Sequence, residues 1–345
     1  MNNIKVLGID LAKDVFQLHG TDAKGNRILT KRLSRGKLIE YMANVTPCLV
    51  GIEACGGAHY WARVFEEHGH TVKIISPQFV KPYVKSTKND ARDAEAIAEA
   101  VTRPNMRFVP KKTMEQQDVL LLHRARELAI KQRTAHGNQL RGLLAEYGIV
   151  VAKGLSHLNK LPEILEMEED KLSSVSKEVF FQLYEQLKTY AEQVVYYEKK
   201  IHSHAATDPR CVAVQAIEGV GPITASAIVA TIGDAHAFKN GREVSAWLGL
   251  VPKQNSSGNK IVLGGISKRG DRYVRKLLVH GARTVVNTCD NKADRKNQWV
   301  TDKKQRCGYN KAAVALANKN ARVIWALLAT GECYRKAASI EAQMA

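Results

Sequence analysis

The segment Ile4-Lys5-Val6-Leu7-Gly8-Ile9-Asp10 is a short apolar run that predicts a buried β-strand, and it ends on a carboxylate. Two further strand-like runs follow it, at Val15–Gly20 and Arg27–Thr30, separated by the turn-forming residues Asp22–Asn26. Short apolar runs bounded by turn residues are typical of neighbouring strands in a sheet. The first thirty residues therefore predict the beginning of a sheet.

After this point the pattern alternates between helix and strand. A helical stretch at Arg35–Asn44 precedes an apolar run at Cys48–Glu53, and a helix at Tyr60–His68 precedes the run Thr71–Ile75. This alternation predicts an α/β fold in which a mixed sheet is flanked by helices.

The middle of the chain is helical in pattern. Apolar residues recur at helical spacing through Glu115–Tyr147 and again through Ser176–His204, where the spacing is close to a heptad. The two helices fit an antiparallel hairpin, a dimerising coiled coil, or a cover for their own domain core. We expect the acidic interval Val150–Ser174 to be a solvated linker rather than a contact for a basic surface.

Asp208-Pro209 ends the second long helix, and the remainder of the chain is predicted to be mainly helical. A chain of 345 residues exceeds the roughly 250–300 residues that one hydrophobic core accommodates. We therefore predict three domains: 1–113, 114–206 and 207–345.

The charge is unevenly distributed among these segments. The chain has 52 Lys and Arg against 34 Asp and Glu, a net charge of +18, of which 1–113 carries +7, 114–206 carries −1 and 207–345 carries +12. The two ends therefore suit a polyanion such as nucleic acid, although a basic excess can also serve solubility. Aromatic residues make up 6% of the chain, too few to predict a stacking platform for single strands.

Several classes of protein are not expected. No apolar run approaches the length of a membrane span, and the chain begins without the layout of a signal peptide, so we expect a soluble, cytoplasmic protein without a membrane partner. The six cysteines lack the CxxC spacing of a zinc site and do not suggest a disulfide framework. We expect them to be reduced thiols.

Four acidic residues stand out by position. Asp10 and Glu53 end two apolar strands, and Asp90 and Asp93 lie three residues apart in a helix-favouring segment, on one helix face. Each acid alone can be explained as a turn former, a solvated strand end or part of a helix N-terminus. Together they could hold two hard cations, and such a pair of ions promotes phosphodiester cleavage.

Bases beside these acids, Lys85, Lys88 and Arg92, suit phosphate contacts. A strand ending in Gly-Ile-Asp also begins actin-like and sugar-kinase ATPases. The glycine-rich phosphate loops of that class do not follow here, since Leu11-Ala12-Lys13-Asp14 comes next.

Two motifs in the last segment fit DNA. Ile217–Ala230 contains Gly219-Val220-Gly221 between two predicted helices, as in a helix-hairpin-helix, where exposed backbone N–H groups of Gly219 and Gly221 would bind a phosphate. A simple turn between two helices is the alternative.

The second motif is a basic loop that contains hydroxyl groups. Seven basic residues and one acid lie between Lys253 and Lys276. A serine in such a loop, Ser256 or Ser257, could attack phosphorus, and Tyr273 is a competing nucleophile on the same grounds. The predicted phosphate contacts are Lys253, Lys260, Lys268, Arg269, Arg272 and Arg275.

These motifs, taken in order, resemble the DEDD transposases of bacterial insertion sequences, the insertion-sequence family one-ten and most closely its eleven-eleven subgroup. The resemblance covers nearly the whole chain. The residues that carry it are Gly8-Ile9-Asp10, Gly51–Ala54, Asn89–Ala94, Gly249–Pro252, Ser256-Ser257-Gly258 and Ile266–Asp271.

The resemblance implies an RNase H-like first domain, similar to the Holliday-junction resolvase RuvC, with Mg²⁺ bound by Asp10, Glu53, Asp90 and Asp93. It implies that a serine of the last domain forms a transient phosphoserine link with DNA. Ser257, beside Gly258, matches the serine of the family best, and Ser256 is the alternative. Members of the family act as oligomers, dimers or tetramers, on element-end and target DNA, guided by a structured noncoding RNA. A site built from the acids of one subunit and the serine of another, in a bacterial protein associated with the nucleoid, is the expected arrangement.

Two rival functions remain at this point. A junction-resolving nuclease would use the acids to activate water and would form no covalent link to DNA. A binding protein with inactive acids would bind nucleic acid without cutting it.

Overall fold

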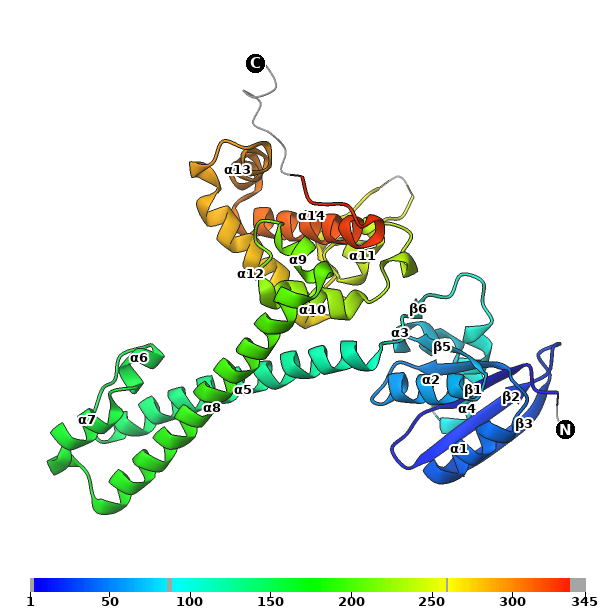
Figure 1. The fold of residues 1–345 in the computed structure, drawn as a ribbon, viewed down its shortest axis with the longest axis horizontal. Coiled ribbons are helices and arrows are strands. Elements are labelled where there is room, and N and C mark those ends of the chain that lie inside the picture. Colours follow the sequence, from blue (N-terminus) through cyan, green and yellow to red (C-terminus); the bar gives the residue numbers. More distant parts are fainter. Residues whose placement is uncertain (1–2, 86–88, 259, 336–345) are drawn as a thin grey trace, which may run out of the picture. The chain divides into compact units, whose positions relative to one another are not determined.

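The computed structural model describes residues 3–85, 89–258 and 260–335. The chain forms two compact units, Met1–Thr113 and Met114–Ala345, whose elements are labelled in Figure 1. The division of the second unit into a middle and a last domain stays a prediction.

The first unit is built on a six-stranded mixed sheet with the order β3-β2-β1-β4-β5-β6. The central strands β1, β4 and β5 are parallel, and the other three pair antiparallel with their neighbours. The strands are β1 Val6–Asp10, β2 Val15–Thr21, β3 Arg27–Ser34, β4 Leu49–Glu53, β5 Thr71–Ile75 and β6 Phe108–Val109. The predicted mixed sheet flanked by helices is confirmed.

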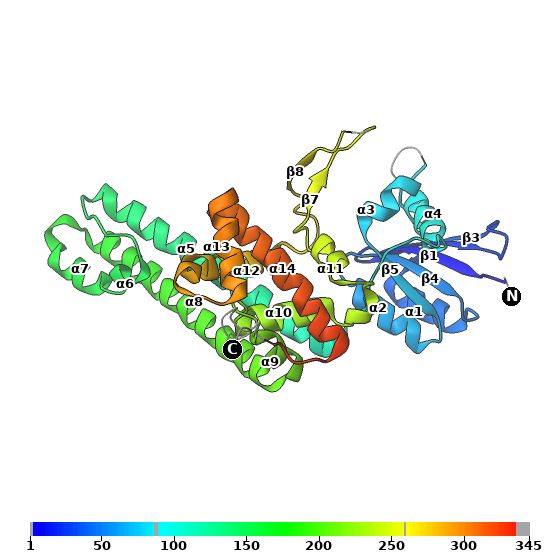
Figure 2. The same ribbon diagram turned by 90° about the horizontal axis from the view of Figure 1, so that it is seen from above.

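Helices cover both faces of this sheet, as Figure 2 shows. On one face α1 (Arg35–Asn44) and α2 (Ala58–Glu67) contribute to a core that contains Leu7 and Ile9 of β1. On the other face lie α3 (Pro77–Val80), the short 3-10 helix η1 (Lys81–Tyr83) and α4 (Asp90–Val101).

Two strand glycines allow α4 to lie against the sheet. A Cβ atom on Gly8 would lie 2.2 Å from the carbonyl oxygen of Ala94, and one on Gly51 would lie 2.9 Å from the Cβ of Val101. Both distances are shorter than real Cβ contacts, so the helix backbone approaches β1 and β4 more closely than any larger residue would permit.

The second unit begins with a long antiparallel hairpin of α5 (Met114–Glu146) and α8 (Ser174–Thr207). The Arg126 guanidinium donates to the carboxylate of Glu198, and His136 bonds Gln186 further along both helices. The contact residue number rises from 126 to 136 along α5 and falls from 198 to 186 along α8, so the two helices are antiparallel. Of the three predicted arrangements, the hairpin is therefore the one formed within the chain.

The prediction of a solvated linker at Val150–Ser174 is wrong. This interval contains α6 (Leu155–Leu158), α7 (Leu161–Met167) and the 3-10 helix η2 (Glu169–Lys171). Leu158, Leu161 and Leu165 are buried in a small core against α5 and α8. The burial of these leucines of α6 and α7 outweighs the acidic residues, which lie outside that core.

The remainder of the second unit is a helical core with a β-hairpin. It contains α9 Pro209–Gln215, α10 Pro222–Ile232, η3 Ala235–Ala237, α11 Gly241–Trp247, β7 Pro252–Gln254, β8 Leu263–Ile266, α12 Arg272–Thr288, η4 Cys289–Asn291, α13 Arg295–Cys307 and α14 Tyr309–Thr330. Every residue of α10 from Thr224 to Ile232 is buried, so this helix is the centre of the core. The predicted helical character of this segment is confirmed.

A buried polar cluster ties the long hairpin to this core. His123 of α5 bonds the Ser226 hydroxyl of α10 at 2.9 Å and the Tyr273 hydroxyl of α12 at 3.0 Å.

All six cysteines are free thiols, as expected. Among the described residues, no helix has the length and apolar character that crossing a membrane requires.

Candidate active site

Strand alternation places the two strand-end acids on one face of the sheet. Asp10 lies two residues after Gly8 and Glu53 two residues after Gly51, and both glycines face α4. Because side chains two apart on a strand share a face, Asp10 and Glu53 are directed to the side of α4. Their neighbours Ile9 and Ile52 are paired across β1 and β4, so the two acids end adjacent strands at the same level.

The helix-borne acids reach the same place from the start of α4. Asn89 caps this helix, since its side-chain oxygen accepts a hydrogen bond from the backbone N–H of Ala91. A carboxylate oxygen from each of Asp10, Asp90 and Asp93 lies within 4.8 Å of the others. Asp10 is eighty residues from Asp90 in the sequence, yet the three acids are gathered in one cluster. Oxygen donors of this kind suit a hard divalent cation.

Cys55 lies beside this cluster, and sequence reasoning gave no signal for it. Desolvation and the negative charges of Glu53 and Asp10 raise the pKa of the Cys55 thiol. The Cys55 thiol therefore lies within electrostatic range of both strand-end carboxylates.

The predicted bases near the acids differ in their surroundings. Lys85 forms ion pairs with Glu95 and Glu99 of α4, at 3.5 and 3.2 Å. Arg92 is half-buried within α4, and Lys88 lies outside the described residues. To bind a phosphate, Lys85 would therefore have to break its ion pairs with Glu95 and Glu99.

The predicted serine loop is a β-hairpin formed by β7 and β8. The Ser256 hydroxyl accepts hydrogen bonds from the backbone N–H of Val262 and the side-chain amide of Gln254. Ser257 is exposed next to Gly258, and its backbone carbonyl accepts from Lys260. Among the described residues, none bonds the Ser257 hydroxyl. Ser256 therefore stabilises the hairpin, whereas the Ser257 hydroxyl is available to a substrate.

The basic loop Ile266–Asp271 follows the hairpin and packs backbone to backbone against the end of α11. A Cβ on Gly249 would lie 2.1 Å from the Arg269 carbonyl oxygen, and one on Gly270 would lie 1.8 Å from that of Trp247. The Arg275 guanidinium donates to the carbonyl oxygens of Leu248 and Arg269, both at 2.9 Å. Arg275 thus holds the loop in place, and Lys268 and Arg269 on the loop are exposed.

Five of the predicted phosphate contacts in this region are exposed basic side chains. They are Lys253, Lys260, Lys268, Arg269 and Arg272. Lys268 adopts a φ of 55°, a conformation that side chains other than glycine seldom take.

Tyr273 is poorly placed as a nucleophile. Its hydroxyl is bonded to His123 inside the unit, and burial raises the pKa of this phenol. A raised pKa reduces the fraction of phenolate, so the competing nucleophile predicted from sequence is disfavoured.

The Gly219-Val220-Gly221 turn lies between α9 and α10, with its two glycines in different surroundings. A Cβ on Gly219 would lie 2.8 Å from the Gly281 carbonyl oxygen, so this glycine is packed against α12. Gly221 is exposed, and among the described residues no atom beyond its two chain neighbours lies within 4 Å of its Cβ position. Of the two, Gly221 is therefore the residue whose backbone a phosphate could approach.

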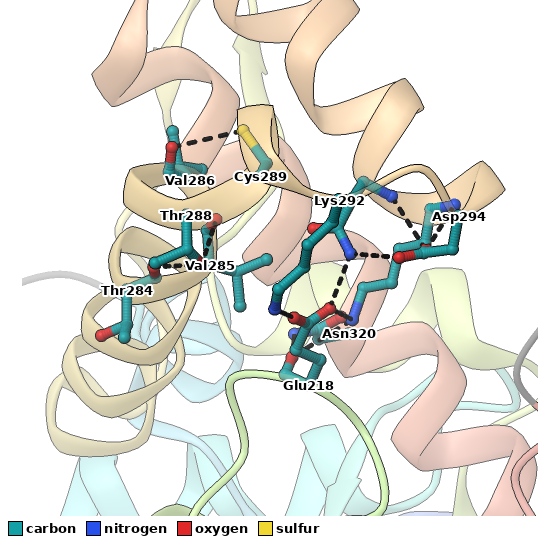
Figure 3. Close-up of polar contacts among 11 residues, drawn as sticks. Glu218, Thr284, Val285, Val286, Thr288, Cys289, Lys292, Asp294 and Asn320 are labelled. Carbon is teal, nitrogen blue, oxygen red and sulfur yellow. Dashed lines mark hydrogen bonds and ion pairs between the residues drawn. The ribbon is translucent and has the colours of Figure 1, made fainter.

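Glu218 fixes this turn to the rest of the unit, as Figure 3 shows. Its carboxylate forms ion pairs with Lys292 and Lys296 and accepts from the amide of Asn297, while its carbonyl accepts from Asn320. The Lys292, Asn297 and Lys296 partners lower the pKa of the Glu218 carboxyl against the opposing effect of burial.

A second group with metal-ligand atoms, His204, Asp208 and Cys211, is a poorer metal site. Asp208 is already bonded by the guanidinium and backbone of Arg210. Burial raises the pKa of the Cys211 thiol to about 12, which disfavours the thiolate that a metal requires.

Two family models match this chain. A transposase model for DEDD enzymes matches residues 7–149, and the model of the "Transposase IS116/IS110/IS902 family" matches residues 211–298. The first match contains the four acids, and the second contains both serines.

Individual relatives match along nearly the whole chain. A probable family 20 transposase of Pseudomonas aeruginosa is 47% identical over 96% of this chain and 99% of its own. The transposase for insertion sequence element IS1111A of Coxiella burnetii is 48% identical, over 97% of this chain and 92% of its own. The transposase for IS1328 of Yersinia enterocolitica is 39% identical, over 97% of this chain and all of its own.

Proposed function

The chain belongs to the IS110 family of insertion-sequence transposases, and on that premise we propose that it exchanges DNA strands through a covalent link between Ser257 and DNA. The observation that carries this proposal is the meeting of the Asp10, Asp90 and Asp93 carboxylates within 4.8 Å, on a chain that also has an exposed serine whose hydroxyl no described residue bonds.

The acids fit a divalent cation. Their oxygen donors come from the end of β1 and the first turn of α4, and Glu53 ends the adjacent strand at the same level. A bound Mg²⁺ would polarise the scissile phosphate and neutralise negative charge that develops on it. The residues themselves orient the phosphate, since their positions are fixed by the close packing of α4 on Gly8.

The serine step conserves the phosphodiester bond energy. The Ser257 Oγ attacks phosphorus, a P–Oγ bond forms, and the bond from phosphorus to the 3′ oxygen breaks. The proton lost by serine balances the proton gained by the 3′ oxygen. Reversal of the step by the 3′ hydroxyl of another strand reseals the DNA and releases serine. Exposed Lys253, Lys260 and Arg269 would stabilise charge on the phosphate.

The same proposal assigns folds and surfaces to both units. The first unit is RuvC-like, and the turn at Gly219 and Gly221 is a helix-hairpin-helix that contacts duplex phosphates through the N-terminus of α10. The sheet order with parallel central strands and the exposure of Gly221 support these two assignments.

Oligomerisation and guidance by a structured noncoding RNA complete the proposal. Large apolar side chains on the outer faces of α5 and α8 support self-association, among them Leu121 and Val195, each 64% exposed. The net charge of +18 supports a second polyanion besides DNA.

The experiment is a denaturing gel of the full chain with Mg²⁺, element-end DNA labelled on either side of the cut, and the adjacent noncoding RNA. We expect a protein–DNA adduct that retains the label on the 5′-phosphate side, that is absent in Ser257→Ala and that persists in Ser256→Ala. Cleavage without an adduct, unaffected by Ser257→Ala, would instead identify a hydrolytic nuclease. Binding without cleavage would identify an inactive DNA-binding protein.

A further inference from the structure

A basic cleft in the second unit lies outside the serine loop and the glycine turn. It has a volume of about 1420 Å³ and is lined by α11, α13, α14 and the β8 strand of the serine hairpin. Clefts that hold drug-sized molecules measure about 300–1,000 Å³, so this one suits a segment of a polymer.

Five basic residues line the cleft, and its described lining contains no acid. Within the parts of the chain that the structure describes, none of the five forms an ion pair. They are Arg242, Lys303, Lys311, Lys319 and Arg322. Burial and the nearby charges of Arg295 and Arg322 lower the pKa of Lys319. Positive charges gathered without carboxylates repel one another, and an anion bound among them would remove that repulsion.

Trp299 and Trp325, two of the four tryptophans in the chain, lie in the same lining. The Lys319 ammonium lies 4.4 Å and the Lys303 ammonium 5.7 Å from the centre of the Trp299 ring. Apolar side chains such as Leu250, Val314 and Ile266 also line the cleft. The cleft therefore combines groups that bind phosphates with surfaces that bind the faces of bases.

We propose that this cleft binds a single strand of nucleic acid, with its phosphates on the five cations and one unstacked base against Trp299. A double helix keeps the faces of its bases stacked inside and would leave the aromatic and apolar lining without a partner. Stacking on an aromatic ring beside basic residues is how proteins hold single strands without reading their sequence. This site is additional to the proposed serine chemistry, because strand binding requires neither Ser257 nor a metal.

The test measures binding by the full chain in EDTA, so that failure of the catalytic proposal cannot affect it. Fluorescence anisotropy would follow a labelled twelve-nucleotide dT strand, the matching rU strand, a duplex of the same length, and an abasic strand that keeps the phosphates. The dT and rU arms distinguish DNA from RNA as the source of the strand. The variants are Trp299→Leu and the triple change Lys303→Gln, Lys311→Gln and Arg322→Gln.

A matched control removes the same charge elsewhere, through Lys131→Gln, Lys160→Gln and Lys199→Gln, all exposed on the long hairpin and the segment that joins its helices. Each lost phosphate contact on a single strand lowers the slope of log affinity against log salt by about 0.7, so the cleft triple variant should lower it by about two. The control should lower it by less than one. Thermal unfolding would verify that all variants remain folded.

The base contact has its own prediction. Base–aromatic stacking strengthens binding by about 5- to 150-fold, so Trp299→Leu should weaken binding of the dT or rU strand by that factor. It should leave binding of the abasic strand unchanged. The proposal is overturned if the control triple variant weakens binding as much as the cleft triple variant. It is also overturned if Trp299→Leu weakens the abasic strand equally, or if the cleft variants affect the duplex as much as the single strands.

Discussion

Gly8→Ala should damage the acid cluster without changing any acid. The new Cβ would lie 2.2 Å from the Ala94 carbonyl oxygen, 2.5 Å from the Ala98 amide nitrogen and 2.8 Å from the Ala98 Cβ. Two of these atoms belong to the backbone of α4 and cannot rotate away. Normal contact begins near 3.4 Å, so α4 would have to retreat by roughly 1 Å.

That retreat has two consequences. Overpacking of this kind destabilises a fold by about 1–3 kcal/mol. Asp90 and Asp93 move with the first turn of α4 while Asp10 stays on β1, and a displacement of about 1 Å in a catalytic group can reduce the rate by about 10²-fold. We therefore expect a lower free energy of unfolding together with a loss of DNA cleavage of that order.

Urea unfolding and Mg²⁺-dependent cleavage of element-end DNA would measure the two effects, with graded controls in the same unit. Gly51→Ala meets mostly side-chain atoms of Val101 and Ile97, beginning at 2.9 Å, and should be milder. Gly36→Ala in α1 has no described atom within 4 Å of the new Cβ and should stabilise by about 0.5–1 kcal/mol, with normal cleavage. Wild-type cleavage by a stably folded Gly8→Ala protein would refute the claim that close packing of α4 positions the acids.

Four further outcomes are expected. Gly281→Ala would place a Cβ 1.8 Å from the Gly219 carbonyl oxygen and should lower the free energy of unfolding by about 2 kcal/mol or more. Gly221→Ala should leave the free energy of unfolding unchanged but weaken duplex binding. Equal unfolding curves for the two variants would contradict this prediction. Burial lowers the pKa of His123 from 6.5 to about 4, so its neutral form stabilises the fold above pH 6.5, and up to about 3 kcal/mol of that stability is lost as pH falls toward 4. His123→Gln should flatten this part of a stability profile measured by urea unfolding at several pH values, and an unchanged profile would exclude His123 as its source. Glu218→Gln leaves Lys296 half-buried beside a neutral amide and should cost about 1–3 kcal/mol in thermal unfolding, with a wild-type midpoint as the contrary result. Ser256→Ala removes two hydrogen bonds of the hairpin and should reduce, without abolishing, adduct formation on a denaturing gel; complete loss would make Ser256 the better nucleophile.

Much of the fold follows from local sequence pattern. The apolar runs ending at Asp10 and Glu53 became β1 and β4, and Arg35–Asn44 became α1 with the same bounds. The interval Val150–Ser174 differs from its prediction because its acidic run is more conspicuous in the sequence than its leucines. The leucines at 158, 161 and 165, on α6 and α7, are what pack against the long hairpin.

The candidate site was predictable only in part. The residue types and the strand-end positions of Asp10 and Glu53 indicate a shared pocket, but the approach of α4 depends on contacts that Gly8 and Gly51 permit. The choice between Ser256 and Ser257 depends on hydrogen bonds across a hairpin that no spacing reveals. The basic cleft could not be predicted from the sequence, because its basic residues are spread over three helices between Arg242 and Arg322 and come together only in the folded unit.

The most direct test of the serine mechanism is peptide mass spectrometry of the protein–DNA adduct after nuclease digestion. The account predicts a single nucleotide-bearing peptide containing residues 256–258, with the phosphate on Ser257 and no modified peptide in Asp90→Ala. DNA strand exchange at the wild-type rate by a Ser257→Ala protein, with no modified residue anywhere in the chain, would contradict it.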